Sequence, residues 1–295
     1  MNKKIKVSEM FLSMQGEGYY TGRNTVWVRL FNCNLQCDGF MQEEPTKPET
    51  YILPYEEVDV NKIHMVEELP IFEYGCDSSY SWAKKFKHLI PEYTPVEIAD
   101  KLEDLVNGKF YIDKSNHIKD THLCFTGGEP LLKPNQKAII KILNELEKRN
   151  NLPSHITIET NSTVELTDDF INMLIHYQNK GIEFLASCSP KLYNVSGEPH
   201  KRAWNHDVSY QYATYFDKIS YKFVINNKEE SWQELDEYIS LLKHKSENIY
   251  IMPVGATVEQ QSQKVIADIA NKALQRGFHV SGRLHCYMFG NGMGT

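Results

Sequence analysis

Short apolar runs alternate with amphipathic stretches along most of this chain, and the alternation predicts its secondary structure. Runs of about four to eight apolar, β-branched or aromatic residues are typical of buried strands. Such runs occur at residues 24–31, 122–126, 156–159, 182–186, 220–225 and 248–252. Apolar positions at helical spacing occur at residues 94–107, 135–149, 167–177, 231–244 and 258–276.

The clearest helix start follows the rules for N-caps. Thr94 can accept a hydrogen bond from the first turn, Pro95 suits the first helical position, and Glu97 can complete a capping box. Asn107 and Gly108 are typical of a helix end, because both residue types adopt a left-handed backbone readily. We therefore expect a helix that begins after Thr94 and ends at Asn107–Gly108.

Strand followed by helix, repeated five or six times, predicts an α/β fold with a parallel sheet and right-handed crossovers. In such folds the carboxyl ends of the strands bring polar residues together at one site. Cys33, Thr126, Glu159, Ser189 and Met252 each fall at a predicted strand end. We expect one site to collect all five.

Composition limits the fold and the location of the protein. With 295 residues, 41% of them hydrophobic, the chain can form one substantial core, and we expect a single domain over residues 1–295. No run of about 18 apolar residues predicts a membrane span. The basic N-terminus is not followed by an apolar segment, which argues against a signal peptide. Six cysteines are too few for a disulfide scaffold, so a reducing cytoplasm is the expected location.

The formal net charge of −7 is concentrated in one segment, residues 38–75. That segment holds ten acidic residues, two basic residues and four prolines. The rest of the chain has 29 acidic and 30 basic residues, which is no basic excess of the kind that nucleic-acid binding requires. We interpret residues 38–75 as an acidic insertion with one short hairpin or helix, and we expect no direct contact with nucleic acid.

Three cysteines carry the most specific chemistry. Cys33 and Cys37 lie after the first predicted strand, and 38 residues separate Cys37 from Cys76. Three thiolates can hold three irons of a 4Fe–4S cluster and leave the fourth iron open for chemistry. Cys37 and Cys76 can meet if the insertion loops out, because each doubling of a loop costs only about 0.6 kcal/mol. The other cysteines are interpreted as structural or as spares near the site: Cys124, Cys188 and Cys286.

Several motifs follow one another in a specific order. They are Met10-Phe-Leu-Ser-Met-Gln-Gly-Glu-Gly-Tyr-Tyr-Thr-Gly22, Asp77-Ser-Ser-Tyr-Ser-Trp82, Thr126-Gly-Gly-Glu-Pro130, Glu159-Thr-Asn-Ser162, Ser189-Pro-Lys191, Lys222-Phe-Val224 and Arg283-Leu-His-Cys-Tyr-Met-Phe-Gly290. Together with the cysteines they resemble the 7-carboxy-7-deazaguanine synthases, a family of radical S-adenosylmethionine (SAM) enzymes. That family usually writes its cluster motif as Cys-x3-Cys-x2-Cys, whereas here 38 residues fill the last gap. The resemblance covers about residues 7–37 and 76–295.

This resemblance implies an incomplete (β/α) barrel with helices outside a parallel sheet. It also implies a lyase that uses a 4Fe–4S cluster, SAM and Mg²⁺. The reaction would convert 6-carboxy-5,6,7,8-tetrahydropterin to 7-carboxy-7-deazaguanine with loss of ammonia, and the product would feed 7-deazaguanine nucleosides such as queuosine. A flavodoxin- or ferredoxin-type reductant and a second copy of the chain in a homodimer are the implied partners.

The resemblance also implies roles for individual residues. The cluster would be held by Cys33, Cys37 and Cys76, and Mg²⁺ by the Ser78 hydroxyl. The implied substrate contacts are Met14, Gln15, Gly16, Glu17, Arg29, Thr126 and Thr295. The implied SAM contacts are Gly75, Cys76, Asp77, Gly127, Gly128, Glu129, Asn161, Ser189, Pro190 and Lys191. The C-terminal residues 292–295 would close on the substrate.

Elementary chemistry fits several of these roles. The glycines at 127 and 128 would let the backbone approach a ligand closely. Arg29 suits a bidentate contact with a carboxylate. Mg²⁺ prefers hard oxygen ligands and keeps several waters, so one serine hydroxyl is a reasonable ligand.

Two other functions share some of these features. Another radical SAM enzyme, such as a glycyl-radical activase, would need the cysteines and the Gly-Gly-Glu-Pro turn but neither Gln15–Gly18 nor the Ser78 hydroxyl. A non-catalytic protein could instead hold a structural zinc through the same cysteines. The insertion could be a loop that shields the cluster, or a lid or docking surface.

Overall fold

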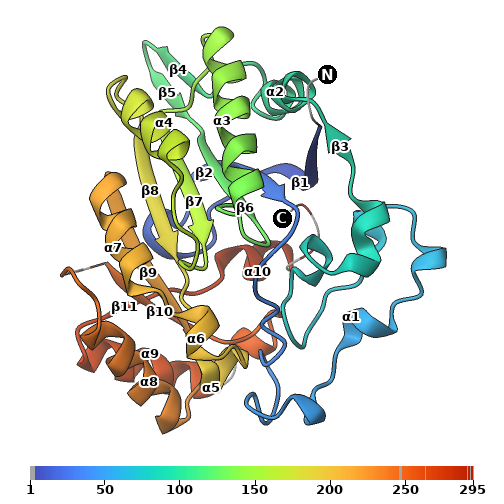
Figure 1. Cartoon of the computed structure of the whole chain (residues 1–295), viewed down its shortest axis with the longest axis vertical. Helices are drawn as coiled ribbons and strands as arrows, with labels where there is room; N and C mark the ends of the chain where they lie inside the picture. Colours follow the sequence, from blue (N-terminus) through green and yellow to red (C-terminus); the bar gives the residue numbers. More distant parts are fainter. Residues whose placement is uncertain (1–3, 246–247, 263, 291, 293, 295) are drawn as a thin grey trace.

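The computed structural model describes residues 4–245, 248–262, 264–290, 292 and 294. Within these residues, nine strands form one sheet in the order β11-β10-β9-β8-β7-β6-β2-β1-β3 (Figure 1). The strands are β1 (Ile5–Met14), β2 (Asn24–Leu30), β3 (Glu92–Tyr93), β6 (His122–Gly127), β7 (His155–Thr160), β8 (Glu183–Cys188), β9 (Lys218–Ile225), β10 (Ile249–Pro253) and β11 (His279–Val280). All six predicted strands are present.

The sheet is parallel from β2 to β11, as expected, and antiparallel strands extend it at its other edge. β1 pairs antiparallel with both β2 and β3. The chain between β1 and β2 is too short for a crossover, which needs about a dozen residues or more, so the second strand must turn back. Gln15 N–H donates to the Arg23 carbonyl at 2.8 Å and closes this turn. The segment 10–14, which the sequence analysis gave only as part of the Met10–Gly22 motif, belongs to β1.

Helices cover the outer face of the sheet, as expected. The long ones are α2 (Pro95–Leu105), α3 (Lys133–Lys148), α4 (Asp168–Gln178), α7 (His206–Tyr215), α8 (Glu229–Ser240) and α9 (Lys264–Gln275). The capping box at Thr94 and Glu97 is present, and Asn107 and Gly108 both have positive φ. α9 begins later than expected, because the Gln260 side chain accepts hydrogen bonds from the N–H groups of Ala256 and Thr257 and holds a turn there.

Other elements carried no sequence signal strong enough to predict. They are the hairpin of β4 (Tyr111–Lys114) and β5 (His117–Asp120) and the short helices α5 (Tyr193–Ser196), α6 (His200–Ala203) and α10 (Leu284–Phe289). Four-residue helices such as α5 and α6 are below the length at which apolar periodicity is informative.

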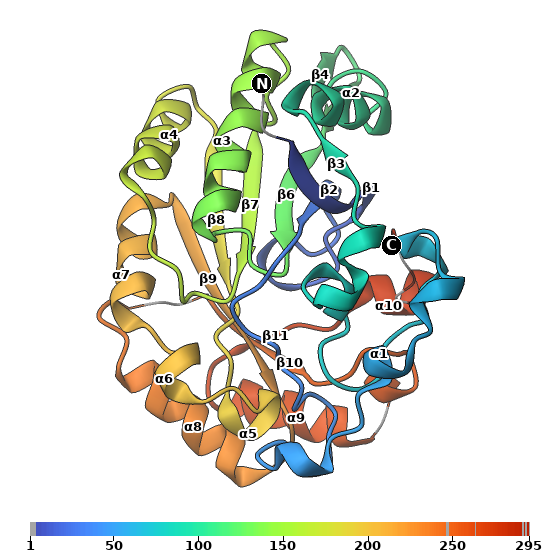
Figure 2. The same ribbon diagram turned by 45° about the vertical axis from the view of Figure 1, so that its right-hand side comes forward.

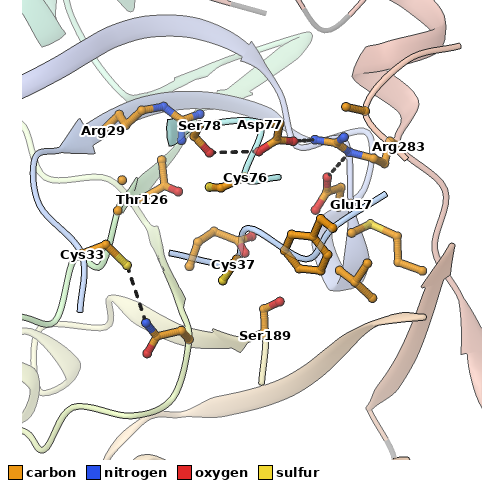
Figure 3. A pocket seen from close by; sticks show the side chains of 18 of the residues that line it. Glu17, Arg29, Cys33, Cys37, Cys76, Asp77, Ser78, Thr126, Ser189 and Arg283 are labelled. Carbon is orange, nitrogen blue, oxygen red and sulfur yellow. Dashed lines mark hydrogen bonds and ion pairs between the residues drawn. The ribbon is translucent and has the colours of Figure 1, made fainter. Parts of the chain in front are cut away.

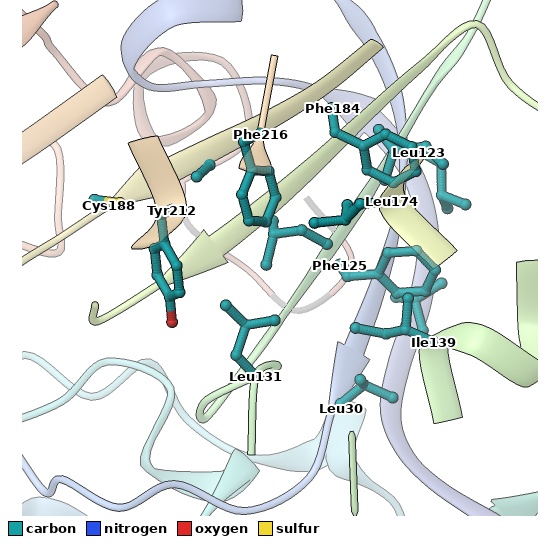
Figure 4. Packing of buried hydrophobic residues seen from close by; sticks show 14 of the residues in the cluster. Leu30, Leu123, Phe125, Leu131, Ile139, Leu174, Phe184, Cys188, Tyr212 and Phe216 are labelled. Carbon is teal, nitrogen blue, oxygen red and sulfur yellow. The ribbon is translucent and has the colours of Figure 1, made fainter. Parts of the chain in front are cut away.

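The main core lies between the sheet and its helices. Leu123 and Phe125 of β6 pack with Ile139 of α3 and Leu174 of α4, and all four are fully buried (Figure 4). Because side chains alternate along a strand, the intervening residues of β6 face the opposite side. The sheet curves around that opposite side without closing, so the architecture is an open parallel α/β barrel.

The insertion forms short helical turns and has a small core of its own. It contains α1 (Pro54–Glu57) and three single 3₁₀ turns at Pro48–Thr50, Val60–Lys62 and Val66–Glu68, and no hairpin among the described residues. Val66, Leu69 and Phe72 are buried against Tyr80 and Phe86, which follow Cys76 in the sequence. The expectation of one hairpin or helix was therefore too simple. Figure 2 shows this segment, in shades of blue, running down from the centre of the molecule and back up along its right-hand side.

None of the described helices is both long and apolar enough to pass through a bilayer.

Candidate active site

A cavity lies at the carboxyl ends of the parallel strands, as the sequence analysis expected. All five strand-end residues named there line it: Cys33, Thr126, Glu159, Ser189 and Met252. They come from β2, β6, β7, β8 and β10 or from the residues just after them. The prediction that one site collects them is confirmed.

The loop that carries Cys33 and Cys37 is held in an unusual backbone shape. Asn32 and Cys37 have positive φ values of 90° and 57°, which costs energy for residues other than glycine. The Glu198 carboxylate offsets that cost, because it accepts hydrogen bonds from Gln36 N–H at 2.6 Å and Cys37 N–H at 2.9 Å. Glu198 therefore fixes the direction of the Cys37 side chain, a role that no sequence motif indicated.

The two ends of the insertion meet at the cavity and bring Cys76 to the other cysteines. Gly75 N–H donates to the Phe40 carbonyl at 2.8 Å, which closes the insertion at its base. Cys33, Cys37 and Cys76 then belong to one apolar contact cluster, and Figure 3 shows them around one part of the cavity. The expected meeting of Cys37 and Cys76 is confirmed.

The spacing of the three thiols suits a cluster better than a single ion. Donor atoms around one zinc lie within about 4.6 Å of one another, since each Zn–S bond is about 2.3 Å. Among the described residues, no group of three donor atoms within 4.8 Å of one another includes these cysteines. Thiolates that bind different irons of one cluster can lie farther apart. This geometry disfavours the zinc alternative.

The environment of the thiols also fits metal binding. Burial raises the pKa of Cys33 to about 12 and raises the pKa values of Cys37 and Cys76, so the thiols alone would stay protonated at neutral pH. The nearby Lys191 ammonium favours the thiolate form and so lowers the pKa of all three cysteines, by less than burial raises it. A bound cation would deprotonate the thiols, as metal ligation requires.

The glycines of the Gly127-Gly128 turn are required by the protein itself. A Cβ at Gly127 would lie 2.1 Å from the Leu30 carbonyl oxygen, and one at Gly128 would lie 2.3 Å from the Asn32 carbonyl oxygen. Gly127 also has φ of 150°. The sequence analysis explained these glycines by the close approach of a ligand. The structure adds a second reason, because only glycine lets the turn pack this closely against β2 and the cysteine loop. Both glycines nevertheless line the cavity.

Glu129 lies behind this turn and is not among the residues that line the cavity. It is fully buried, and its carboxylate accepts hydrogen bonds from Leu131 N–H, Thr160 Oγ1–H and Asn161 N–H, each at 2.8 Å. Burial raises the pKa of Glu129 to about 7. Glu129 thus positions Asn161, whose amide lies 3.9 Å from the Cys33 sulfur (Figure 3).

A chain of buried ion pairs forms the polar floor of the cavity. Lys222 Nζ lies 2.5 Å from Glu17 Oε2 and 3.1 Å from Glu159 Oε2. The Arg283 guanidinium lies 2.9 Å from the other Glu17 oxygen, Oε1, and 2.6 Å from Asp77 Oδ2 (Figure 3). It therefore links these two carboxylates. Burial alone would raise the pKa of Glu17, but Lys222 and Arg283 hold it well below the usual range. Glu17 is therefore a carboxylate at any physiological pH.

Arg29 faces the cavity from β2 and is paired in the structure with Glu9 of β1. Its Nε lies 2.7 Å from Glu9 Oε2, which also accepts the Tyr80 hydroxyl at 2.5 Å. The other Glu9 oxygen accepts Gly294 N–H at 3.1 Å, so the C-terminal segment reaches this edge of the cavity. A substrate carboxylate that binds Arg29 must therefore share or replace Glu9.

Asp77 and Ser78 place two hard oxygens side by side. Ser78 Oγ lies 3.0 Å from Asp77 Oδ1 while Arg283 holds Asp77 Oδ2 (Figure 3). Both residues line the cavity. Oxygen donors of this kind suit Mg²⁺.

Most of the residues expected at the site line this cavity. They are Met14, Gln15, Glu17, Arg29, Cys33, Cys37, Gly75, Cys76, Asp77, Ser78, Thr126, Gly127, Gly128, Asn161, Ser189 and Lys191. Gly16 and Pro190, like Glu129, are not among its lining residues. Gly16 instead packs on His285, where a Cβ would lie 1.9 Å from the ring. Thr295 lies outside the described residues, although Gly292 and Gly294 line the cavity.

Sequence reasoning missed other residues of the cavity. Lys222 and Arg283 were noted only as parts of motifs, and Glu9, Tyr80 and His285 were not singled out. Glu9 lies opposite Arg29 in the β1–β2 register. The pairing of Glu9 with Arg29 could have been predicted if β1 had been recognised as a strand, because opposite charges on paired strands stabilise each other.

Three cysteines and a Gly-Gly turn at the carboxyl ends of an open parallel barrel are the features of a radical SAM enzyme. Comparison with known proteins narrows this class. The chain is 27% identical to a 7-carboxy-7-deazaguanine synthase of Rhodopirellula baltica, over 99% of this chain and 89% of that protein. It is 26% identical to one of Hyperthermus butylicus, over 97% of this chain and 93% of that protein. The resemblance drawn from the motifs is confirmed.

The fold is also similar to a solved structure, QueE from Escherichia coli. The TM-score is 0.53 at 18% identity, over 96% of this chain and 95% of that chain. No protein-family model matches the chain.

Proposed function

We propose that this chain is a radical SAM lyase that converts 6-carboxy-5,6,7,8-tetrahydropterin to 7-carboxy-7-deazaguanine with loss of ammonia. The observation that carries the proposal is the shared cavity. It brings the three cysteines together with Gln15, Glu17 and Arg29. A cofactor and a polar heterocycle can therefore lie in contact there. The product would enter queuosine or other 7-deazaguanine biosynthesis.

Cys33, Cys37 and Cys76 would hold a 4Fe–4S cluster, and the turn at Gly127 with Ser189 and Lys191 would hold SAM. When bound, these cofactors would supply radical chemistry directed at C6 of the pterin. Lys191 Nζ lies 2.8 Å from Ser189 Oγ, so a cation and a hydroxyl face the same space. Such a pair suits the carboxylate of SAM.

The chain's own residues would orient the pterin. The Glu17 carboxylate, held ionised by Lys222 and Arg283, can accept hydrogen bonds from the N–H groups of the pterin ring. Gln15 is fixed by its amide contact to Glu159 at 3.1 Å. Arg29 would bind the substrate carboxylate. Holding the heterocycle against these preset groups is the protein's contribution to a cofactor-driven reaction.

Mg²⁺ would bind at Ser78 beside the substrate carboxylate. The Ser78 hydroxyl is adjacent to the Asp77 carboxylate, whose pKa is held below its usual value because Arg283 outweighs the effect of burial. The ion would neutralise part of the negative charge brought in by the substrate.

We further propose a flavodoxin- or ferredoxin-type protein as the electron donor, a homodimer as the assembled state, and the cytoplasm as the location. Separately, the acidic residues of segment 38–75 would favour a partner with a basic contact surface, because opposite charges steer association.

The test is one anaerobic incubation of reconstituted protein with dithionite, SAM, Mg²⁺ and 6-carboxy-5,6,7,8-tetrahydropterin, read by mass spectrometry. The expected result is 7-carboxy-7-deazaguanine. 5′-Deoxyadenosine without that product would keep the radical SAM class and refute the substrate. Protein with a full cluster that forms neither compound would refute the reaction. An activase would instead form a glycyl radical on a partner protein.

A further inference from the structure

The amino-terminal ends of the strands carry a second polar cluster, remote from the cavity. Asp120 ends β5, His122 begins β6 and His155 begins β7. Because His122 and His155 begin β6 and β7, they lie at the ends of these strands away from the arrowheads in Figure 1, whereas Thr126 and Glu159 of the same strands line the cavity. The proposed reaction uses none of the three.

The three side chains point their donor atoms at one another. Asp120 Oδ2 lies 3.5 Å from His155 Nδ1 and 4.0 Å from His122 Nε2. One donor atom from each residue lies within 4.8 Å of the others, and no other such trio exists among the described residues. Two imidazoles and one carboxylate are a common ligand set for zinc and related transition metals.

His122 has the environment of a ligand without a partner. It is 2% exposed, and its Nδ1 is buried with no hydrogen bond. Its Nε2 reaches only the 4.0 Å contact with Asp120. Leaving a buried polar nitrogen unpaired costs about 1–3 kcal/mol.

We propose that Asp120, His122 and His155 bind a divalent transition-metal ion, with Zn²⁺ as the best fit. The two imidazole rings are stacked, with centroids 4.3 Å apart and planes 12° apart. A shared ion therefore requires the more exposed ring, His155, to turn about χ2, which is a broad and soft torsion. Ser154 Oγ contacts both Asp120 and His155 Nδ1 and can orient the carboxylate as a supporting partner.

Glu183 would stay outside this ligand set. Its carboxylate lies 3.9 Å from His155 Nε2 but already binds the Tyr20 hydroxyl and Lys218, the latter at 2.9 Å. Because the Lys218 ammonium balances Glu183, Asp120 supplies the negative charge for the ion. Water would complete the coordination, since Asp120 and His155 are both partly exposed.

The bound ion would stabilise the loop that carries Glu17 and Tyr20. Tyr20 packs edge-on against both imidazoles, with centroid distances of 4.8 Å to His122 and 5.7 Å to His155. Cross-linking the ends of β5, β6 and β7 beneath Tyr20 would therefore stabilise this loop. The inference stands on these contacts and does not depend on the proposed reaction.

The test uses the untagged full chain with its cysteine site reconstituted, so that the thiols are occupied. The protein is incubated with a small excess of ZnCl₂, desalted, and assayed for zinc and iron in the same sample. The wild-type chain should retain about one zinc, and His155→Ala and Asp120→Asn should retain none. His206→Ala is the matched control, because His206 is a half-buried histidine outside this trio, and its Nε2 lies 3.3 Å from the Tyr238 carbonyl oxygen. It should retain zinc as the wild type does.

Thermal unfolding supplies an independent readout. At a hundredfold excess over Kd, zinc should raise the Tm of the wild type and of His206→Ala by about 5 °C and leave His155→Ala and Asp120→Asn unchanged. Asp120→Asn keeps the size of the side chain, so its fold can be checked by its Tm without zinc. Wild-type protein that retains no zinc would overturn the proposal. Equal retention in the wild type and in both ligand variants would overturn it as well.

Discussion

The Arg283 guanidinium lies 2.6 Å from the Asp77 carboxylate and so ties the C-terminal segment to the residue that follows Cys76. The same guanidinium lies 2.9 Å from Glu17 on the loop after β1. One buried cation thus connects three parts of the chain that are far apart in sequence. Breaking a buried ion pair from one side is costly, because it leaves a charge without compensation.

Replacing this cation should therefore be strongly destabilising. We expect Arg283→Met to lower the free energy of unfolding by about 3 kcal/mol and to abolish product formation, measured by urea denaturation and by the mass assay. Lys243→Met removes an exposed ion pair with Asp207 and should cost less than about 1 kcal/mol. Equal losses in the two variants would contradict the role given to Arg283.

Arg29 is expected to act on substrate binding and not on the cluster. Arg29→Lys keeps the charge but loses the planar two-point contact, so the KM for the pterin should rise by about tenfold or more while iron content stays unchanged. Glu9→Gln removes the carboxylate that competes for Arg29 and should leave the KM equal or lower. An unchanged KM in Arg29→Lys would show that the substrate carboxylate binds elsewhere.

The insertion should be part of the folded structure near the cluster. Phe72 is 1% exposed among residues that follow Cys76, and Phe72→Ala should cost about 3–5 kcal/mol and reduce the iron retained after reconstitution. Ile52, in the same insertion, is 54% exposed, so Ile52→Ala should change stability by less than about 0.5 kcal/mol. A Phe72→Ala variant as stable as Ile52→Ala would show that the insertion is dispensable.

Asp38 should destabilise the protein at neutral pH. Partial burial and the nearby Glu198 and Glu56 carboxylates raise the pKa of Asp38 to about 6. The folded state then holds this proton more tightly than the unfolded state, so stability falls as pH rises from about 4 to about 6 and stays lower above that range. Asp38→Asn should add about 1 kcal/mol at pH 8, after allowance for solvent screening, and nothing near pH 4.

Urea denaturation at several pH values measures this difference. Asp113→Asn, which changes an exposed carboxylate on β4, is the control and should alter stability by less than about 0.5 kcal/mol. A stabilisation by Asp38→Asn that is equal at both ends of the range would mean that charge is not its cause.

The iron content of cysteine variants should distinguish the proposed cluster ligands from the cysteines interpreted as structural. Cys76→Ala should lose most of the iron after anaerobic reconstitution, because a three-thiolate site becomes a two-thiolate site. Cys188→Ala, a fully buried position outside the cavity lining, should keep it. Loss of iron in Cys188→Ala but not in Cys76→Ala would reverse the ligand assignment.

Much of the architecture followed from local signals. The apolar runs, the capping box at Thr94 and the polar residues at strand ends predicted the parallel strands, the helices around them and the edge at which the site lies. The antiparallel β1 was missed because its C-terminal half was considered only as part of the Met10–Gly22 motif. The single-domain prediction and the roles of individual ligands stay predictions.

The sequence by itself determined which residue types meet at the site, because strand order along the chain fixes which carboxyl ends share an edge. Only the tertiary structure decided their partners. That Arg283 pairs with Glu17 and Asp77, that Glu129 lies behind the turn, and that Asp120 meets His122 and His155 all depend on distances between segments that no local pattern encodes. Ion pairing and burial are properties of three-dimensional proximity, and proximity across tens or hundreds of residues is set by the packing of the whole core.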